Sequence, residues 1–261
     1  MPVSVELKGV SKSFGKKRAL DNITIKFTEG KLHGLIGSEG AGKTTLIRVI
    51  MELYSHDEGD VFWKEDGKEV EFLDLREKIS YMPGAQSLYP DLSVKEHLEF
   101  FRELYSLPKE EFASQRDRLL EITRLGKFTE RRSRELSGGM YKKLGLMCAL
   151  LQKPKVLLLD EPTNGVDPIS RREFWDLLYD LSGQKITIII STAYMDEAER
   201  CHEAHLMDAG KHLASGEPRK LLAEAGVKSF DEYYLKRGTK CRTARQWWSI
   251  ISSSPSGTSR R

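Results

Sequence analysis

The sequence predicts an α/β protein with a mostly parallel core sheet, an antiparallel β subdomain and an inserted helical subdomain. Three observations lead to this class. The apolar runs Val156–Leu159 and Ile186–Ile190 are typical of strands buried on both faces. Segments with helical periodicity alternate with such runs, which favours a parallel sheet covered by helices. The first segments of the chain instead alternate apolar and polar residues, as half-exposed strands do.

The elements of the N-terminal third can be assigned in order. Half-exposed strands are predicted for the stretches VSVELKGVSKSFG and RALDNITIKF. A strand, a glycine-rich loop and an amphipathic helix are predicted for KLHGLIGSEGAGKTTLIRVIMEL. The stretch GDVFWKEDGKEVEFL has the pattern of a hairpin.

The middle of the chain is predicted to be helical, and the inserted subdomain is placed at about residues 87–140. One apolar helical stripe is predicted for Leu98, Phe101, Leu104 and Tyr105. Strand KVLLLD, helix SRREFWDLLYDLSG and strand KITIIIS then restore the alternation. In IIISTAYMDEA the strand is predicted to run through a polar corner into a helix. Ala193 stands at this corner, in a place where α/β proteins put their chemistry.

Composition favours a soluble globular protein. The chain has 261 residues, 39% of them hydrophobic and 31% charged, enough for one large domain or two small ones. Its apolar runs are too short to cross a bilayer, and MPVSVELKGV lacks an apolar signal segment. Cys148, Cys201 and Cys241 form neither a metal pattern nor a disulfide framework, so reduced thiols are expected. We therefore expect a cytoplasmic protein whose membrane role, if it has one, depends on a partner.

Charge divides the chain into a body and a tail. The net charge is +3, but residues 236–261 hold seven basic and no acidic residues, so the body is mildly acidic. Direct nucleic-acid binding by the body is therefore not expected. The globular domain is placed at residues 3–235, and the tail is predicted to be disordered. Trp247 and Trp248 in the tail could touch a membrane surface or RNA, or the tail could be a non-native extension.

The stretch GSEGAGKT, residues 37–44, matches the P-loop pattern between a predicted strand and a predicted helix. Glycines let backbone N–H groups converge on phosphate oxygens, and the helix directs its positive end at them. Lys43 would add a charge for the β- and γ-phosphates, and the Thr44 hydroxyl could bind Mg²⁺. The alternative is a glycine-rich turn that binds nothing, which the filled pattern disfavours.

The stretch VLLLDEP supplies a second set of candidate residues. Its apolar strand would place Asp160 beside the P-loop, where it could hold Mg²⁺ through water. Glu161 could orient or deprotonate an attacking water. A DE pair alone could merely cap a helix, but the upstream P-loop favours catalysis.

The order of four motifs identifies a family resemblance. LSGG begins at Leu136, just upstream of VLLLDEP, and TNGVDP follows. Together with the P-loop, this order resembles the ATP-binding cassette (ABC) ATPases over residues 3–225, and most closely the subunits of ABC-2-type and multidrug exporters. The fold that the resemblance implies is a P-loop NTPase.

The resemblance implies a head-to-tail dimer with two ATP molecules, each between one P-loop and the opposite LSGG. Phosphates would be held by Gly37, Ser38, Glu39, Gly40, Ala41, Gly42, Lys43, Thr44 and Thr45. The opposite γ-phosphate would meet Ser137, Gly138 and Gly139, and Asp167 would link the two sites. Glu161 would be the catalytic carboxylate and Phe14 would stack on adenine, although a Phe on an edge strand is commonly core. ATP, Mg²⁺, a second ATPase domain and transmembrane permease subunits are the implied cofactors and partners.

Two positions depart from the family pattern. Ala193 occupies the position of the switch histidine that contacts the γ-phosphate, and Gly84 follows YMP where the family has a glutamine. Gln86 lies two residues further on. Both departures affect the site on this chain's own P-loop, so we expect ATP to be held there with weak turnover, while LSGG completes a partner's site. The alternative is that Glu161 suffices and Ala193 is a subfamily variant.

Three functions remain open. The first is the ATP-hydrolysing subunit of an exporter at the inner face of the cell membrane, with an interface near SLYPDLSV that includes Leu88 and Tyr89. The second is a soluble ABC protein acting on ribosomes, or half of a tandem ATPase, which the single cassette and acidic body disfavour. The third is an ATP-binding clamp, which the presence of Glu161 disfavours.

Overall fold

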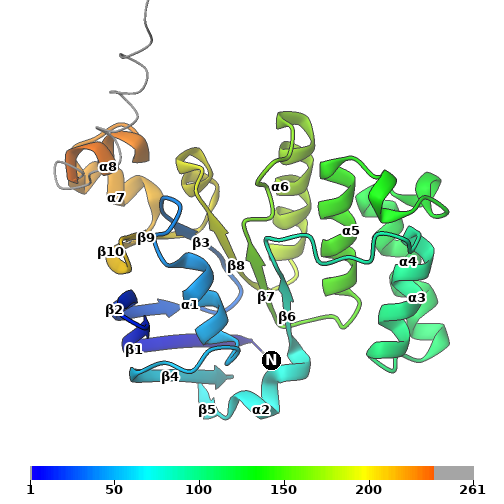
Figure 1. Ribbon diagram of the computed structural model, residues 1–261, viewed down its shortest axis with the longest axis horizontal. Helices are drawn as coiled ribbons and strands as arrows, with labels where there is room; N and C mark the ends of the chain where they lie inside the picture. Colours follow the sequence, from blue (N-terminus) through cyan, green and yellow to red (C-terminus); the bar gives the residue numbers. More distant parts are fainter. Residues whose placement is uncertain (1, 238–261) are drawn as a thin grey trace, which may run out of the picture.

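The structure is a computed structural model that describes residues 2–237 (Figure 1). Helix α8 (Phe230–Arg237) is the last helix among the described residues, and the domain boundary after residue 235 stays a prediction. Trp247, Trp248 and Cys241 lie outside the described residues. Cys148 and Cys201 are buried free thiols. Within the described part of the chain, no helix has both the length and the apolar character needed to span a membrane.

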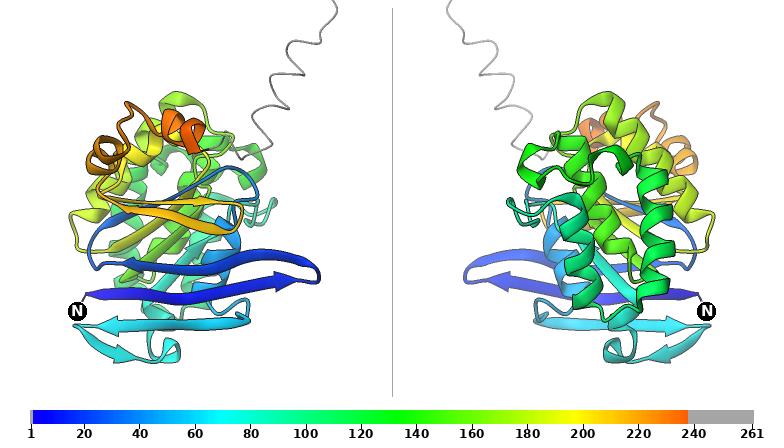
Figure 2. Two further views of the ribbon diagram at one scale, coloured as in Figure 1. Left: turned by 90° about the vertical axis from the view of Figure 1, so that its left-hand side faces the viewer. Right: turned by 90° about the vertical axis from the view of Figure 1, so that its right-hand side faces the viewer.

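Two sheets form the framework of the molecule. The antiparallel sheet has the order β2-β1-β4-β5, from the strands β1 (Val3–Phe14), β2 (Lys17–Phe27), β4 (Glu58–Glu65) and β5 (Lys68–Val70). The second sheet has the order β10-β9-β3-β8-β7-β6, from β3 (Leu32–Ile36), β6 (Ile79–Met82), β7 (Val156–Asp160), β8 (Thr187–Thr192), β9 (Glu203–Asp208) and β10 (Lys211–Gly216). All neighbouring pairs in the second sheet are parallel except β9 with β10. Figure 2 shows the antiparallel sheet as a separate layer beside the β9–β10 hairpin.

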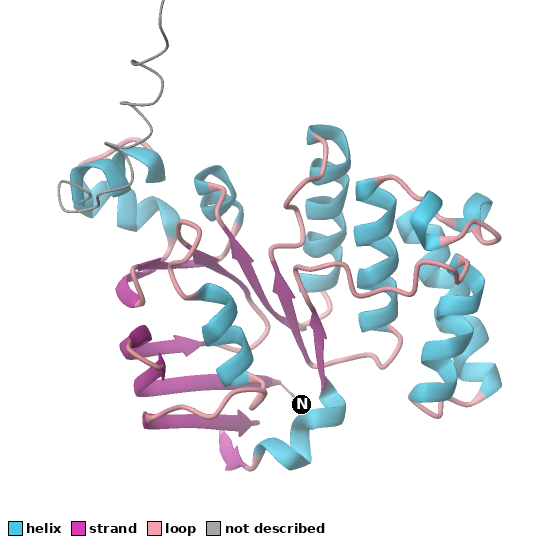
Figure 3. Ribbon diagram, viewed as in Figure 1, coloured by secondary structure: helices cyan, strands magenta, loops and turns pink. Residues whose placement is uncertain are grey.

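The helices divide between the two faces of the parallel strands (Figures 1 and 3). Helix α1 (Lys43–Ile50) lies between the two sheets, whereas α5 (Gly138–Leu150) and α6 (Pro168–Ser182) cover the opposite face. Strand β7 shows why its sequence is continuously apolar. Val156 and Leu158 pack in the cluster around α1, and Leu157 and Leu159 pack in the cluster around α5 and α6. Both faces of the strand are therefore buried, as its apolar run predicts.

The inserted subdomain consists of α3 (Val94–Leu104) and α4 (Lys109–Thr123), on the far side of α5 from the sheet (Figure 1). Ser93 and Glu96 start α3 with reciprocal side-chain-to-backbone hydrogen bonds, which satisfy two otherwise unpaired N–H groups. Leu98 is buried and Phe101 and Tyr105 pack against the core. Leu104 is 60% exposed, so its predicted place in the apolar stripe is wrong, because α3 ends there.

The C-terminal part of the body closes one edge of the parallel sheet. The β9–β10 hairpin is followed by α7 (Pro218–Ala225) and α8 (Phe230–Arg237). Short elements complete the fold: α2 (Phe72–Leu75) and the 3₁₀ turns Arg76–Lys78, Gly126–Phe128, Ser133–Glu135 and Met195–Arg200. The helix predicted after Ala193 is thus only one 3₁₀ segment.

Candidate functional site

Four parallel strands end at the same edge of the sheet and bring the candidate residues together there. Strand β3 leads into the P-loop, β7 ends at Asp160, β8 leads to Ala193 and β6 leads towards Gly84. Register pairs Ile36 with Thr192 and Asp160 with Ser191. This edge is where open α/β sheets bind ligands.

The P-loop itself is fixed by close backbone contacts. A Cβ at Gly37 would collide with the carbonyl oxygen of Met207 on β9, so only glycine fits there. Gly42 has a φ of 101°, in the left-handed region that favours glycine. The Ala41 N–H donates to Ser38 O at 3.1 Å, and Ala41 O accepts from Gly210 N at 3.0 Å. The loop is therefore held from both sides by contacts within the protein.

Lys43 is folded back onto the P-loop. Its ammonium donates to Gly37 O at 2.8 Å and to Ser38 O at 3.0 Å, and lies 3.2 Å from Glu161 Oε1. The side chain is only 3% exposed. A buried positive charge at the N-terminus of helix α1 is well placed to bind a polyphosphate.

Asp160 is the centre of an oxygen cluster. Its Oδ1 accepts from Thr44 Oγ1 at 3.0 Å and from Ser191 Oγ at 2.6 Å. Oδ2 lies 3.5 Å from Tyr81 Oη, and burial followed by the Asp160 charge raises the pKa of Tyr81. Hydroxyl and carboxylate oxygens are the ligands that Mg²⁺ prefers, so Thr44 and Asp160 suit this ion. Ser191 and Tyr81 were not among the residues singled out from the sequence.

Glu161 is held in an unusual backbone conformation beside Lys43. Its φ is +45°, which costs free energy for a residue with a side chain. The Glu161 N–H donates to Ser191 O at 3.1 Å and Ser191 Oγ at 2.9 Å, which fixes the turn. The carboxylate accepts from Asn164 Nδ2 at 3.3 Å. The strained backbone of Glu161 at the end of β7 points its carboxylate towards Lys43 of the P-loop.

A cavity of about 440 Å³ opens between the P-loop and the antiparallel sheet. Gly40, Gly42, Thr44 and Thr45 line it together with three basic residues, Lys17, Arg18 and Lys43, and with Glu161 and Phe14. Phe14 is 46% exposed, and its ring meets Tyr54 edge to face at 5.3 Å. It belongs to the cavity wall and not to the core.

The two departed positions have different surroundings. Ala193 lines a cavity of about 100 Å³ together with Glu39, Glu161 and Asn164, so space remains beyond its methyl group. Gly84 is tightly placed, because a Cβ there would lie 2.9 Å from Asp160 O. A glutamine at position 84 would therefore require the backbone to move. Gln86 is exposed and lines neither cavity.

Lys142 is a residue that sequence reasoning missed. Its ammonium donates to Gly84 O at 3.0 Å. Burial lowers the pKa of Lys142, while the nearby Asp160 and Glu161 charges oppose this shift. The position of Lys142 shortly after LSGG was the only available signal, and it did not indicate that this side chain reaches back to the P-loop edge.

The LSGG motif lies apart from both cavities, at the start of α5. Ser137 caps this helix by accepting from Met140 N at 3.3 Å. Gly139 packs so closely on Ser170 that a Cβ would collide with it. Asp167 caps the neighbouring helix α6 through the N–H groups of Ile169 and Ser170, and these bonds lower the pKa of Asp167. A Cβ at Gly138 would lie 3.3 Å from Gly165 O, so the motif and the Asp167 loop form one surface.

Comparisons with known proteins identify the family. The family model described as ABC transporter matches residues 20–164. A probable multidrug ABC transporter ATP-binding protein of Escherichia coli (strain K12) is 42% identical over 234 residues, which cover 87% of this chain and 39% of that protein. The chain thus spans about two fifths of that relative's length. A daunorubicin resistance ATP-binding protein of Streptomyces coeruleorubidus is 35% identical over 90% of this chain and 75% of its own length.

Solved structures agree. The ATP-binding subunit of an ABC transporter matches with a TM-score of 0.77 and 27% identity, over 89% of this chain and 98% of its own. An ATP-binding cassette of an ABC transporter in its ADP conformation matches with a TM-score of 0.74 and 25% identity, over 86% of this chain and 94% of its own. These matches confirm the predicted fold class. The chain belongs to the ABC transporter family and is one of its ATP-binding domains.

Proposed function

We propose that this domain binds ATP with Mg²⁺, pairs with a second cassette, and uses hydrolysis to drive export through transmembrane permease subunits at the inner face of the cell membrane. The observation that carries the proposal is the convergence of Lys43, Thr44, Asp160 and Glu161 at one strand edge. The names of the relatives, multidrug and daunorubicin resistance proteins, favour export.

Each residue then has a definite task. The P-loop N–H groups and Lys43 hold the phosphates, with Phe14 against the base at the mouth of the 440 Å³ cavity. Mg²⁺, held by Thr44 and Asp160, would neutralise charge on the β- and γ-phosphates. Ser137, Gly138 and Gly139 meet the nucleotide bound to the partner cassette, and Asp167 beside them couples the two sites.

The ion pair between Lys43 and Glu161 gives the site a simple order of events. The Lys43 ammonium lies 3.2 Å from Glu161 Oε1. A triphosphate carries more negative charge than one carboxylate, so it draws Lys43 away. Glu161 is then free to accept a hydrogen bond from the attacking water and orient it. The hydrolytic group is thus released only when substrate is present.

We propose that the nucleotide site on this chain's own P-loop is the weaker site of an asymmetric pair. Ala193 offers no hydrogen-bond donor to the γ-phosphate, and Gly84 offers none to the attacking water. Loss of one such donor typically costs about 10²–10³ in rate. The surface formed by Ser137–Gly139 and Asp167 keeps every family residue and could complete a competent site on a partner. A clamp that binds ATP with little turnover is the second candidate, and the 100 Å³ space beside Ala193 is the observation that favours it.

The permease contact is proposed for the outer end of the inserted subdomain. Tyr89 is 51% exposed and its ring packs edge to face on Phe100 at 5.1 Å. Leu88 instead packs partly against the core. Two exposed aromatic rings in contact are a plausible anchor for a partner helix. A ribosomal role finds no support among the described residues, and co-purification with membrane proteins or with ribosomal RNA separates the two.

The test is Mg²⁺-dependent ATP turnover by the purified chain, with ATP binding measured on the same samples. Glu161→Gln should keep binding and lower turnover by about 10²–10⁴-fold, because it removes the group that orients water. The exposed Glu224→Gln on α7 serves as a matched control and should change neither quantity. Turnover that survives Glu161→Gln would contradict the role of Glu161, and binding without wild-type turnover would favour the clamp.

A further inference from the structure

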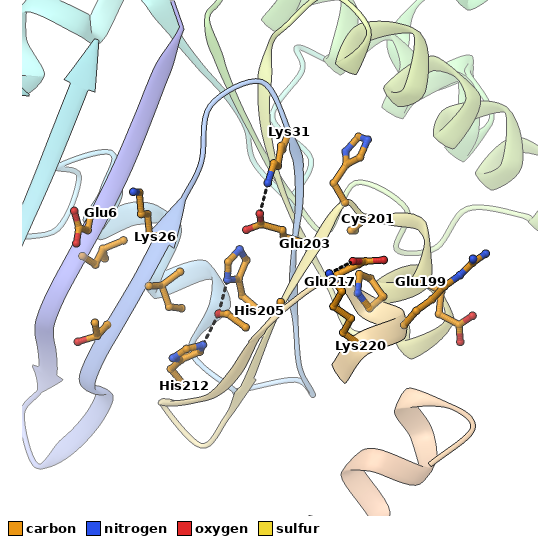
Figure 4. Close-up of a pocket in the computed structure, with 18 residues that line it drawn as sticks. Glu6, Lys26, Lys31, Glu199, Cys201, Glu203, His205, His212, Glu217 and Lys220 are labelled. Atoms are coloured by element: carbon orange, nitrogen blue, oxygen red, sulfur yellow. Dashed lines mark hydrogen bonds and ion pairs between the residues drawn. The ribbon is translucent and has the colours of Figure 1, made fainter. Parts of the chain in front are cut away.

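Glu203, His205 and His212 line a pocket beside the antiparallel sheet (Figure 4). This pocket shares no lining residue with the cavity beside the P-loop. His33 comes from β3, Glu203 and His205 from β9, and His212 from β10. Register places His33 opposite Glu203 and Leu35 opposite His205, so these side chains share one face of the sheet. His33 and His205 are 0% and 1% exposed.

The two buried imidazoles face one another through single nitrogens. His33 Nδ1 and His205 Nε2 are 3.0 Å apart. The other nitrogen of His33, Nε2, lies 2.7 Å from Thr28 O, which can only accept, so this nitrogen carries the proton. His33 therefore presents a lone pair at Nδ1 to the space between the rings. Burial lowers the pKa of both histidines, which keeps them neutral near pH 7.

A carboxylate oxygen completes a set of three facing atoms. Glu203 Oε2 is 3.7 Å from His33 Nδ1, and the three candidate ligand atoms lie within 4.8 Å of one another. Glu203 Oε1 is 2.5 Å from Lys31 Nζ, which orients the carboxylate. Burial raises the pKa of Glu203, but the hydrogen bond from Lys31 and its charge outweigh burial and leave this pKa below its ordinary value.

We propose that His33, His205 and Glu203 form a binding site for a divalent transition metal, with Zn²⁺ the best match. Two imidazoles and one carboxylate are a known zinc ligand set, with a water in the fourth position. Zn–N bonds of about 2.0–2.1 Å place two such nitrogens about 3.3 Å apart across a tetrahedral ion. The rings would therefore part by only a few tenths of an ångström from their present 3.0 Å.

The outer contacts suit this site as well. Metal-bound histidines usually donate their second N–H to an oxygen, which fixes the ring. Thr28 O has this position for His33, and Ser215 Oγ, 2.6 Å from His205 Nδ1, has it for His205. His205 needs only to move its proton from Nε2 to Nδ1, with no net proton change. Ser215 Oγ is also 2.6 Å from His212 Nε2, which can accept its hydroxyl proton.

An entry path exists, and two nearby side chains, Cys201 and His202, are poor competitors for the ion. A cavity of about 820 Å³ reaches Glu203, His205 and His212, and it could admit both the ion and its water. Cys201 also lines this cavity, but burial raises the pKa of its thiol and keeps it protonated. His202 Nδ1 already accepts from Leu32 N at 3.0 Å.

The ion would join β3 to β9 directly behind the P-loop. Ile36 and Leu206 pair at the ends of these strands, and Met207 O contacts Gly37. At this place the metal would hold together the two strands that support the phosphate loop.

The test uses Zn²⁺ titration by calorimetry and Co²⁺ absorption on the full chain, without an affinity tag or nucleotide. Wild-type protein should bind one ion per chain, and Co²⁺ should give the d–d absorption of a four-coordinate site. Outer-shell changes already cost 10–100-fold in affinity, so His205→Gln should weaken binding by about 100-fold or more. Glu203→Gln, at a partly exposed position, should also weaken Zn²⁺ binding. This second variant keeps the test valid if His205→Gln does not fold.

The matched control is His202→Gln, which removes an imidazole from the same cavity without removing a proposed ligand. It should bind Zn²⁺ as wild type does. Failure of the folded wild-type chain to bind would overturn the proposal. So would one-ion binding that persists in both His205→Gln and Glu203→Gln, since the ion would then lie elsewhere.

Discussion

Strand β3 connects two polar regions of opposite construction. At its carboxyl end, the phosphate end, consecutive loop residues offer backbone N–H groups and the Lys43 charge around an open cavity. In its first half, the histidine end, the buried His33 meets side chains of β9, and His205 in turn contacts Ser215 of β10. The first region is built from one contiguous motif and the second from residues far apart in the chain.

This difference decides how each region responds to change. The phosphate end depends on the loop backbone, so single side chains near it adjust rate while the loop remains in place. The histidine end depends on neutral imidazoles that burial keeps unprotonated. Substitutions that change the rate of ATP turnover should therefore act at the phosphate end only. A change of pH should act mainly on the histidine end.

The largest expected effect is a gain at the phosphate end. Ala193→His places an imidazole in the 100 Å³ cavity beside Glu161 and supplies a donor to the γ-phosphate. A recovered donor is worth up to about 10²–10³ in rate. Steady-state ATP turnover should rise towards this limit, with Zn²⁺ binding unchanged.

Ala193→Leu is the matched control for this gain, because it fills the same cavity without a donor. Its turnover should stay at the wild-type level. Equal gains in both variants would show that filling the cavity matters and the donor does not, and no gain in either would place the limit on turnover elsewhere.

A smaller effect is expected at Lys142. Lys142→Met removes the hydrogen bond to Gly84 O and a positive charge close to Asp160 and Glu161. A hydrogen bond from a charged donor is worth about 1.5 kcal/mol or more, so turnover should fall about tenfold. Lys142→Arg should retain most of the activity.

The neighbouring Lys143→Met tests whether this effect is local. Lys143 Nζ pairs with Glu173 of α6 at 2.5 Å, so its loss should lower the melting temperature more than turnover. A comparable loss of turnover in both variants would mean that α5 packing, and not the contact with Gly84, supports activity.

The same contrast explains what the sequence could predict. The P-loop, Asp160 and Glu161 follow from short patterns whose spacing is fixed by local geometry. The contacts of Ser191 with Asp160 and of Lys142 with Gly84 depend on strand order and helix placement, which no short pattern contains. The apolar runs predicted the parallel strands, but Leu104 shows that periodicity does not reveal where a helix ends.

The histidine end could not be predicted at all. His33 and His205 are 172 residues apart in the sequence and become neighbours only because β9 pairs with β3. In a strand pattern, each appears as an isolated polar residue in an apolar run. Nothing in the spacing indicates a pair, and only the sheet order brings the two rings together.

The smallest expected effect is on stability, and it separates the two ends by pH. Burial, followed by the charges of His33 and His212, places the pKa of His205 well below its ordinary value of 6.5. Burial also lowers the pKa of His33, against the opposing charge of Glu203, with Lys31 and His202 adding to the lowering. The unfolded chain therefore binds protons at His33 and His205 that the folded chain does not bind. The free energy of unfolding that comes from keeping these two histidines neutral is therefore complete above about pH 6.5, and it is lost as pH falls through the lowered folded pKa values.

Melting temperatures measured with a chelator present should decline below pH 6.5, by roughly 2–4 °C for each kcal/mol lost. His205→Gln should flatten the decline, and the exposed His56→Gln should leave it unchanged. An unaltered slope in His205→Gln would assign the pH dependence to another group and remove this distinction between the two ends of β3.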